Sequence, residues 1–280
     1  YRYEVYDYAA AALRKHRMNP EERDLNTDNT VSAEQVMISK DTAWVDDEGR
    51  IVRQTITRPL SGPWDFLNTY IVNIYPDTTC WVNDFQNADN ERYLKLYFSH
   101  SAYDDYPVVG VSWEQANAFC AWRTDYLMKG MGGYARQIQR FRLPTEIEWE
   151  YAARGKSGNP FPWESGEVKS DKGCFYANFK PDRGNYTMDG SLITSKCGIF
   201  SANSNGLYDM AGNVEEWCQD LYASYSSSSS QKNPTGPSSG SNRVYRGSCW
   251  YSSEWGSRIC FRCFNTPDIG SQSRGLRLAL

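Results

Sequence analysis

The run from Gly206 to Trp217, GLYDMAGNVEEW, constrains the fold of this chain more than any other stretch. Its glycines permit backbone angles that other residues resist, and they let neighbouring groups approach closely. Asn213, Glu215 and Glu216 then place oxygen atoms beside a tightly folded backbone. Hard cations such as calcium are bound by carboxylate, amide and carbonyl oxygens. The run therefore predicts either a turn that leads into a short helix or a loop that holds a metal ion.

Length and charge narrow the class of protein. A chain of 280 residues can form one large domain or two small ones with a sizeable core. Its 30 basic and 34 acidic residues give a net charge of −4, so nucleic acid is not an expected partner. No stretch approaches the roughly 20 apolar residues that span a bilayer. The sequence starts at Tyr1 without an initiator methionine or signal peptide, so we expect it to be part of a longer protein.

The cysteines leave their chemistry open. The chain has 8 cysteines and 2 histidines. An even number of cysteines permits disulfides, but spacing alone does not select a pairing. Cys260 and Cys263 form a single C-x-x-C pair, whereas a zinc site usually needs a second such pair or two histidines. We expect a structural role for this pair.

The first hundred residues predict one helix and several short strands. Residues 3–17 are rich in alanine and precede an Asn-Pro pair, which predicts a helix that ends there. Residues 51–57 and 69–75 have the composition of short strands. Proline, aspartate and asparagine clusters separate these pieces, so residues 20–106 predict long loops with short strands.

Two helices are signalled by capping boxes. Ser112 and Gln115 form one such box, and the following apolar residues predict a buried face. That face comprises Ala116, Phe119, Cys120, Arg123 and Leu127.

Thr145 and Glu148 form the second box, and Gly155 ends that helix. Ile147, Tyr151 and Ala152 are predicted to share its buried face. Residues 223–242 are rich in serine, glycine and proline and predict an exposed loop, followed by a strand at 243–246.

Several segments, in order, resemble the formylglycine-generating, or sulfatase-modifying-factor, family. They are PVVGVSW at 107–113, RLPTEIEWEYAARG at 142–155, the run at 206–217, and RVYRG at 243–247. The resemblance covers the chain from about residue 107 to its end. It implies an α+β fold, a loop-rich variant of the C-type lectin fold with short strands and few helices. We therefore expect a single domain over residues 1–280, with an insertion-like region at 20–106 and the N-terminal part of the fold missing.

The resemblance also implies two structural calcium sites. One ligand set lies in the motif ANF at 177–179 and the motif DGS at 189–191, and the other lies in the run at 206–217. Side chains and backbone carbonyls would both contribute. The first set comprises Asn178, Phe179, Asp189 and Ser191, and the second comprises Gly212, Asn213, Val214 and Glu216.

Catalytic members of the family bind Cu(I) with two cysteines that follow a glycine- and serine-containing segment, because soft thiolates select that ion. Alignment on residues 243–250 places Ser252 and Ser257 at those two positions. Alignment on the NTPD motif at 265–268 instead places Cys249 and Glu254 there. Either alignment lacks a thiol pair, so we expect no copper and no oxidase activity.

The first half of the chain has a narrower resemblance. The segments at 75–85, 97–113 and 178–190 are similar to the gliding-motility and type IX secretion lipoproteins of the GldK/PorK and GldJ kind. That similarity implies a non-catalytic scaffold on the periplasmic side of the bacterial outer membrane, held by a lipid anchor outside this chain. It also implies a ring formed with a GldN/PorN-like partner.

Two other functions stay open. One is a copper-dependent oxidase with rearranged thiols, in which Cys249 works with Cys260 or Cys263. The other is carbohydrate binding, which rests on fold analogy alone. The aromatic residues of the first half suit either an interface or a core; they are Trp44, Trp64, Phe66, Tyr70, Trp81 and Phe85.

Overall fold

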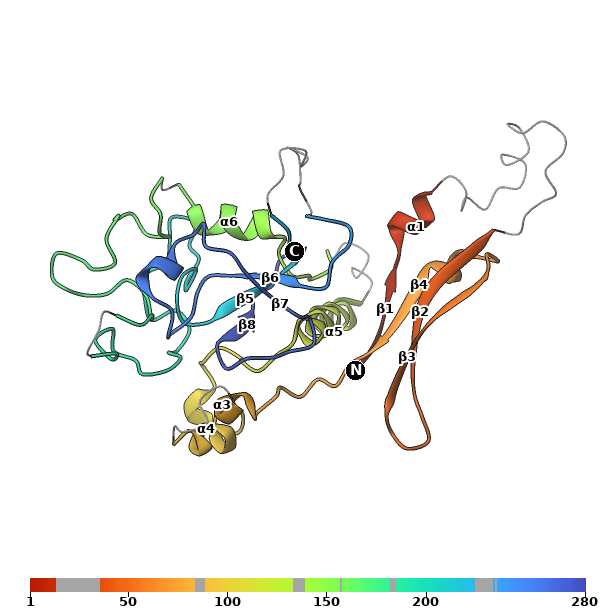
Figure 1. The fold of residues 1–280 in the computed structure, drawn as a ribbon, viewed down its shortest axis with the longest axis horizontal. Coiled ribbons are helices and arrows are strands. Elements are labelled where there is room, and N and C mark those ends of the chain that lie inside the picture. Colours follow the sequence, from red (N-terminus) through yellow and green to blue (C-terminus); the bar gives the residue numbers. More distant parts are fainter. Residues whose placement is uncertain are drawn as a thin grey trace. The chain divides into compact units, whose positions relative to one another are not determined.

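The computed structural model describes residues 1–13, 36–83, 89–132, 139–156, 158–181, 185–224, 234 and 236–280. Its contacts divide the chain into two compact units, Tyr1–Ile74 and Tyr75–Leu280. Each unit is a continuous stretch of sequence (Figure 1). The single domain over 1–280 and the insertion-like region at 20–106 stay predictions.

Unit 1, Tyr1–Ile74, consists of two antiparallel strand pairs. β1 (Arg2–Tyr6) pairs with β4 (Leu67–Ile71), and β2 (Met37–Val45) pairs with β3 (Ile51–Pro59). The predicted strand at 51–57 is therefore confirmed, whereas the one at 69–75 begins and ends earlier than predicted. A short helix, α1 (Tyr8–Ala12), follows β1, and a 3₁₀ turn, η2 (Pro63–Phe66), precedes β4.

The helix predicted at 3–17 is wrong over its first residues. Residues 2–6 form β1, in which Tyr3 lies opposite Tyr70 with their ring centres 5.4 Å apart. Aromatic and β-branched residues favour a pleated strand when a partner strand is present, and this pairing overrides the helix propensity of the alanines. The helix starts only after Asp7, whose carboxylate accepts the amide of Ala10 at 2.8 Å. Residues 14–17 of the predicted helix lie outside the described residues.

Unit 2, Tyr75–Leu280, surrounds a four-stranded sheet with helices and long loops. The strand order is β7 (Cys263–Asn265), β6 (Arg243–Arg246), β5 (Glu215–Leu221), β8 (Arg274–Leu276). The β5–β8 pair is parallel and the other two pairs are antiparallel. The helices are α3 (Cys80–Asn83), α4 (Glu91–Leu96), α5 (Trp113–Met131) and α6 (Glu146–Arg154), with 3₁₀ turns η3 (Ser101–Tyr103) and η5 (Glu254–Ser257). The mixed α/β character with few helices and short strands is as predicted, and the relation to the C-type lectin fold stays a prediction.

Both predicted capping boxes are present. The Ser112 hydroxyl accepts the amide of Gln115 at 3.1 Å, and the Gln115 side chain accepts the amide of Ser112 at 2.8 Å. Thr145 and Glu148 make the same reciprocal pair at the start of α6. Gly155 ends α6 with a φ of 55°, so a left-handed glycine stops the helix as predicted.

The predicted buried faces are partly wrong. On α5, Ala116 and Cys120 are buried, but Phe119 is exposed.

On α6, Ile147 and Tyr151 are exposed, whereas Glu146, Trp149 and Ala153 are buried. Glu146 is accommodated because Arg262 donates two hydrogen bonds to its carboxylate. The buried charge is therefore paired, which a search for apolar periodicity does not detect.

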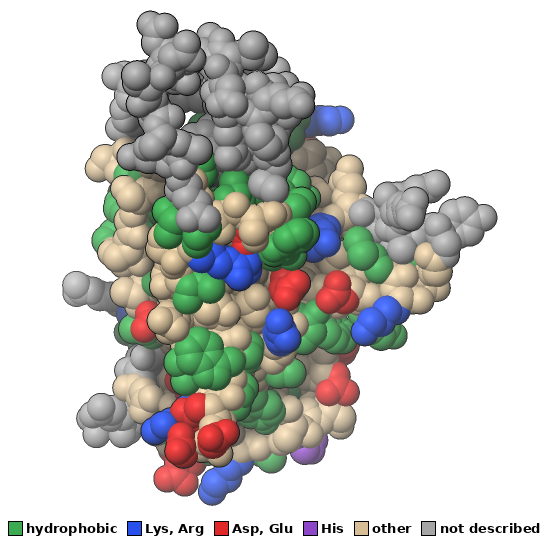
Figure 2. Space-filling model, turned by 90° about the vertical axis from the view of Figure 1, so that its right-hand side faces the viewer, with side chains coloured by type: hydrophobic (Ala, Val, Ile, Leu, Met, Phe, Trp, Pro, Cys, Tyr) green, Lys and Arg blue, Asp and Glu red, His purple; other side chains and the backbone are tan. Residues whose placement is uncertain are grey.

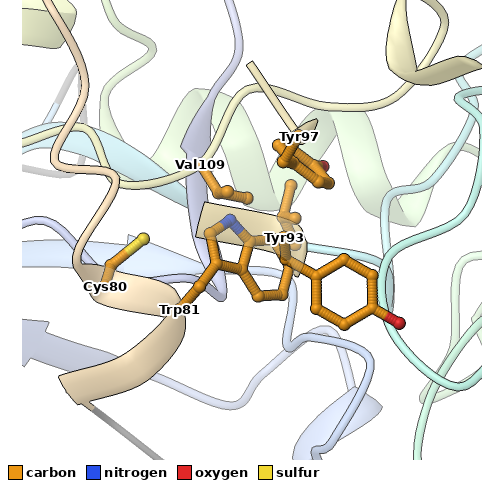
Figure 3. Close-up of a cluster of buried hydrophobic side chains, with 6 residues drawn as sticks. Cys80, Trp81, Tyr93, Tyr97 and Val109 are labelled. Atoms are coloured by element: carbon orange, nitrogen blue, oxygen red, sulfur yellow. The ribbon is translucent and has the colours of Figure 1, made fainter. Parts of the chain in front are cut away.

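Three apolar clusters form the core of unit 2. In the first, Trp81 is fully buried and its ring centre lies 4.8 Å from that of Tyr97 and 5.2 Å from that of Tyr93 (Figure 3). The second joins α6 to the sheet through Trp149, Cys218 and Val244. The third joins α5 to Trp217 of β5. Together they fix the sheet between α5 and α6, so the loops at the strand ends have a rigid base.

Charge on the surface is mixed in sign. Acidic and basic side chains are interspersed on the face shown in Figure 2. No helix among the described residues is long and apolar enough to cross a bilayer.

Candidate functional site

The run at 206–217 is a tight loop followed by a strand, not a turn followed by a helix. Gly212 and Asn213 both adopt positive φ angles, 80° and 63°, and β5 begins at Glu215. A Cβ atom on Gly212 would lie 2.2 Å from the carbonyl oxygen of Asn178. Glycine is therefore required at 212 for two reasons, the backbone angle and the close approach of another loop.

Asn213 joins three loops. Its amide donates to the carbonyl of Asn178 at 2.7 Å, and its side chain exchanges two hydrogen bonds with the backbone of Ser195, at 2.9 and 3.1 Å. Its own carbonyl accepts the amide of Trp250 at 3.0 Å. Asn178 is similarly buried and donates to the carbonyl of Ile193 at 2.9 Å. These side chains replace the regular backbone hydrogen bonds that the loops lack.

The first predicted calcium set is brought together by the fold. The Asp189 carboxylate accepts the amides of Phe179 and Ser191 at 2.9 and 3.1 Å. Burial raises the pKa of Asp189, and the side-chain oxygen of Asn178 is buried without a hydrogen-bond partner. A bound cation would satisfy the unpaired oxygen and favour the ionised carboxylate. Asn178, Phe179, Asp189 and Ser191 therefore fit a calcium ion, and the site stays a proposal.

The second predicted set fits a cation poorly. Arg277 donates to both carboxylate oxygens of Glu216, at 2.7 and 2.9 Å, and the indole of Trp149 donates to one of them at 2.7 Å. The side chain of Asn213 is bonded to Ser195, as described above. Because these side-chain oxygens already accept hydrogen bonds, only the backbone carbonyl oxygens of Gly212 and Val214 could still coordinate a cation. In this arrangement Glu216 and Asn213 stabilise the loop directly.

We propose that calcium raises the melting temperature of this protein through Asp189. An ion that binds only the native state stabilises it by mass action, by about 2.7 kcal/mol at a hundredfold excess over Kd. We expect excess chelator to lower the melting temperature of the wild type, and Asp189→Asn to abolish the difference between calcium and chelator. Asp209→Asn is the matched control, because Asp209 is also a partly buried loop carboxylate that accepts a backbone amide. Equal melting curves in calcium and chelator for the wild type would remove the ion from this account.

The segment at the predicted thiol positions folds around Ser252. The thiol of Cys249 lies 3.2 Å from the Ser252 hydroxyl, which also accepts the Cys249 amide at 3.0 Å. Cys249 is fully buried, and burial raises the pKa of its thiol to about 12. Ser257 is buried too, and its hydroxyl lies 3.2 Å from that of Ser248. The fold thus brings one protonated thiol against one hydroxyl.

Seven of the cysteines are free thiols in the structure: Cys120, Cys174, Cys197, Cys218, Cys249, Cys260 and Cys263. Cys260 is exposed, whereas burial raises the pKa of Cys263. Among the residues that the structure describes, no three His, Cys, Asp or Glu side chains are grouped as metal ligands would be.

A cavity of about 590 Å³ lies beside the thiol-position segment. One wall is formed by Tyr251, Glu254 and Trp255, and the other by residues 167–169, 175 and 179–181, including Phe179. The Lys180 amide donates to the Ser252 carbonyl at 2.9 Å and joins the two walls. The cavity is therefore lined by Phe179 of the first calcium set and by the residues on either side of Ser252.

Glu215 and Arg274 form a buried polar centre that the sequence did not reveal. The Glu215 carboxylate lies 3.4 Å from the Arg274 guanidinium and 3.4 Å from the Ser273 hydroxyl. Burial raises the pKa of Glu215 to about 7 despite the nearby arginine. Tyr251, on the cavity wall, donates to Ser273 at 3.1 Å. The adjacent carboxylates at 215 and 216 were a visible signal, but their arginine partners are about 60 residues away, at separations of 59 and 61.

The known proteins that are similar in sequence include formylglycine-generating enzymes and an inactive relative of them. The chain is 36% identical to mouse formylglycine-generating enzyme over 182 residues, and this aligned region covers 62% of this chain and 44% of that protein. It is 35% identical over 185 residues to the formylglycine-generating enzyme of Streptomyces coelicolor, covering 62% and 52%. It is 34% identical over 180 residues to mouse inactive C-alpha-formylglycine-generating enzyme 2, covering 62% and 48%. The match thus spans about half the length of these relatives.

A solved structure is also similar. Treponema denticola variable protein 1 superposes with a TM-score of 0.53 at 28% identity, covering 64% of this chain and 73% of that one. The family model described as the sulfatase-modifying factor enzyme 1-like domain matches residues 14–280. The chain therefore belongs to the sulfatase-modifying factor enzyme 1-like domain family.

Proposed function

We propose that this chain is a non-catalytic structural component of the type IX secretion and gliding-motility machinery. In this proposal it is a lipoprotein scaffold of the GldK/PorK kind, or of the related GldJ kind, on the periplasmic side of the outer membrane. The lipid anchor lies outside this chain, and a GldN/PorN-like protein is its ring partner. Similarity of the segments at 75–85, 97–113 and 178–190 to those lipoproteins supports this assignment.

The observation that carries the non-catalytic part is the environment of Cys249. A copper oxidase of this family needs two thiolates in reach of one Cu(I) ion. Here the buried Cys249 thiol has a pKa raised to about 12, so it is protonated at neutral pH. Its close neighbour is the hydroxyl of Ser252, at 3.2 Å. A hydroxyl is a poor ligand for Cu(I).

Family membership is compatible with either a catalytic or a non-catalytic chain. The relatives include proteins named formylglycine-generating enzyme and a protein named inactive C-alpha-formylglycine-generating enzyme 2. The named enzymes favour a copper-dependent oxidase that acts on protein cysteine as the second candidate. The choice between a catalytic and a non-catalytic chain therefore depends on the residues at the two thiol positions.

Exposed aromatic residues of the first half support a role in protein contact. Trp44 and Trp64 are 42% and 55% exposed, whereas Phe66 and Trp81 are buried and belong to the core. Tyr70 is partly buried, and Phe85 lies outside the described residues. Two of the six candidate aromatics thus remain available for an interface.

We expect no conversion of a cysteine-containing sulfatase peptide to formylglycine when the purified protein is supplied with copper and oxygen. Mass spectrometry of the peptide reads out the product, with the Streptomyces coelicolor enzyme as positive control. Cu(I) titration of the wild type and Cys249→Ala should give the same weak binding. Formylglycine product, or tight copper binding that Cys249→Ala abolishes, would establish the oxidase instead.

The scaffold part has its own test. The full-length protein, extracted from native membranes, should co-purify with a GldN/PorN-like protein in a fixed ratio. Extraction of the protein alone, with no such partner and no enrichment in the outer-membrane fraction, would contradict the secretion assignment. That outcome leaves the copper result untouched, so the two parts of the proposal fail separately.

A further inference from the structure

The cavity beside the thiol-position segment has aromatic side chains on both of its walls. Phe179 and Pro181 on one wall are buried, whereas Tyr251 and Trp255 on the other are 38% and 62% exposed. The indole of Trp255 is held by Phe261, with the two ring centres 5.1 Å apart and an angle of 79° between the ring planes. An exposed ring that is held in place is a platform on which the flat apolar side of a ligand can stack. A volume of about 590 Å³ is also typical of small-molecule sites.

Charged side chains of both signs line the same cavity. Four such side chains are exposed there, and none of them forms an ion pair within the described part of the chain: Glu167, Lys169, Lys180 and Glu254. The ammonium group of Lys169 lies 4.5 Å from the ring centre of Phe175. That of Lys180 lies 4.7 Å from the ring centre of Tyr186. The two positive and two negative charges cancel, so the lining has no net charge that would favour an anion or a cation.

These groups limit the chemistry of a ligand that fits the cavity. A carboxylate only accepts hydrogen bonds and an ammonium group only donates them, whereas a hydroxyl does both. A polyol can therefore bond to Glu254 and to Lys180 in one site without carrying a charge. A pyranose ring with the glucose configuration has its hydroxyls around its edge and C–H groups on its two faces. Such a ring presents a flat apolar face to an indole while its hydroxyls reach the charged groups.

The lining disfavours an extended peptide. Extended peptides are commonly held by main-chain hydrogen bonds to the edge of a sheet. The lining residues lie in loops and in η5, and none of them belongs to β1–β8. The cavity therefore offers a ligand charged side chains and an aromatic face, and no strand edge.

We propose that this cavity binds a neutral oligosaccharide of β-linked, glucose-configured rings, with one ring stacked on Trp255. Glu254, the residue before Trp255 in the chain, accepts hydrogen bonds from ring hydroxyls. Lys180 donates to them from the opposite wall, where its own amide already bonds to the carbonyl of Ser252. Binding of this kind is independent of the proposed secretion function, because it needs no partner protein and no lipid anchor.

Isothermal titration calorimetry of the whole chain tests the proposal with two probes, cellohexaose and the β-1,4-linked hexamer of N-acetylglucosamine. At least one of them should bind with a Kd below about 1 mM, and Trp255→Ala should weaken that binding by about tenfold or more. Trp255→Phe keeps a flat ring and should weaken it less. Trp64→Ala is the matched control, because Trp64 is 55% exposed and lies in the other unit, so its replacement should leave binding unchanged. The absence of saturable binding of either probe up to about 2 mM would overturn the proposal.

The chemical class of the ligand is tested separately. Binding of a neutral sugar should be unchanged between about 50 and about 500 mM salt, because no ion pair is screened. Lys180→Met and Glu254→Leu should each weaken it severalfold, since each removes one hydrogen-bonding group from the cavity. The cysteine-containing sulfatase peptide is the competing probe: if it binds in place of the sugars and Trp255→Ala abolishes that binding, the cavity is a peptide site and the proposal is wrong. Sugar binding that Trp255→Ala leaves unchanged would place the sugar elsewhere on the chain and would also overturn the proposal.

Discussion

Gly212→Ala is expected to destabilise this protein by on the order of 3 kcal/mol. An alanine at a φ of 80° costs about 1 kcal/mol or more, because its Cβ crowds the following carbonyl oxygen. The new Cβ would also lie 2.2 Å from the backbone oxygen of Asn178, so one of the two loops has to shift. That shift strains the hydrogen bonds that Asn213 makes to Asn178 and Ser195. Denaturant unfolding measured by circular dichroism gives the change in the free energy of unfolding.

Gly206→Ala is the matched control for this variant. Gly206 has a similar φ of 77°, but nothing lies within 4 Å of the position that its Cβ would take. Its replacement should cost only the backbone term, about 1 kcal/mol. The difference between the two alanine variants therefore measures the close approach of the loops. Similar losses for both would show that the contact with Asn178 is not a constraint.

Arg246→Met is expected to cost about 3–5 kcal/mol, because it removes a fully buried cation that Glu146 and Glu150 share with Arg262 and Arg154, and it leaves two buried carbonyls without their donor. Arg246 is 1% exposed. Its guanidinium forms an ion pair with Glu150 and lies 3.6 Å from Glu146, and it donates to the carbonyls of Cys260 and Phe261 at 3.2 and 2.9 Å. One side chain thus holds α6, β6 and the segment before β7 together. Denaturant unfolding measures the loss in the free energy of unfolding.

Arg154→Met separates this effect from simple loss of an arginine. Arg154 also pairs with Glu150, at 2.7 Å, but its side chain is 42% exposed. Exposed ion pairs on one helix contribute about 0.3–0.5 kcal/mol. A loss for Arg246→Met no larger than that for Arg154→Met would contradict the buried network.

Local signals predicted local structure well in this chain. The capping boxes at Ser112 and Thr145 involve residues three positions apart, and each is present in the structure. The stop at Gly155 and the strand at 243–246 are local in the same sense. Residues 2–6 show the limit, because their strand exists only through pairing with β4, some 65 residues further on. The periodicity of residues 2–6 gives no information about the strand with which they pair.

The candidate site was predictable in its positions but not in its bonding. The resemblance places Asn178 and Asp189 in one calcium set and Asn213 in the other, and the structure brings the loop of Asn178 against both. The two calcium sites themselves stay predictions. The pairing of Glu216 with Arg277 could not be predicted from the sequence. Ion pairs depend on proximity in the folded chain, and any of the 30 basic residues could have been the partner. The same holds for Glu215 and Arg274. Burial, which raises the pKa of Cys249, is likewise a property of the assembled core.

The division of the chain after Ile74 bears on where the polypeptide can be cut. Each unit is one uninterrupted stretch, so the backbone passes between them once. A break between Ile74 and Tyr75 separates no strand from its partner, because every paired strand lies in the same unit as its partner. Two fragments that meet at this bond would therefore each carry complete sheets.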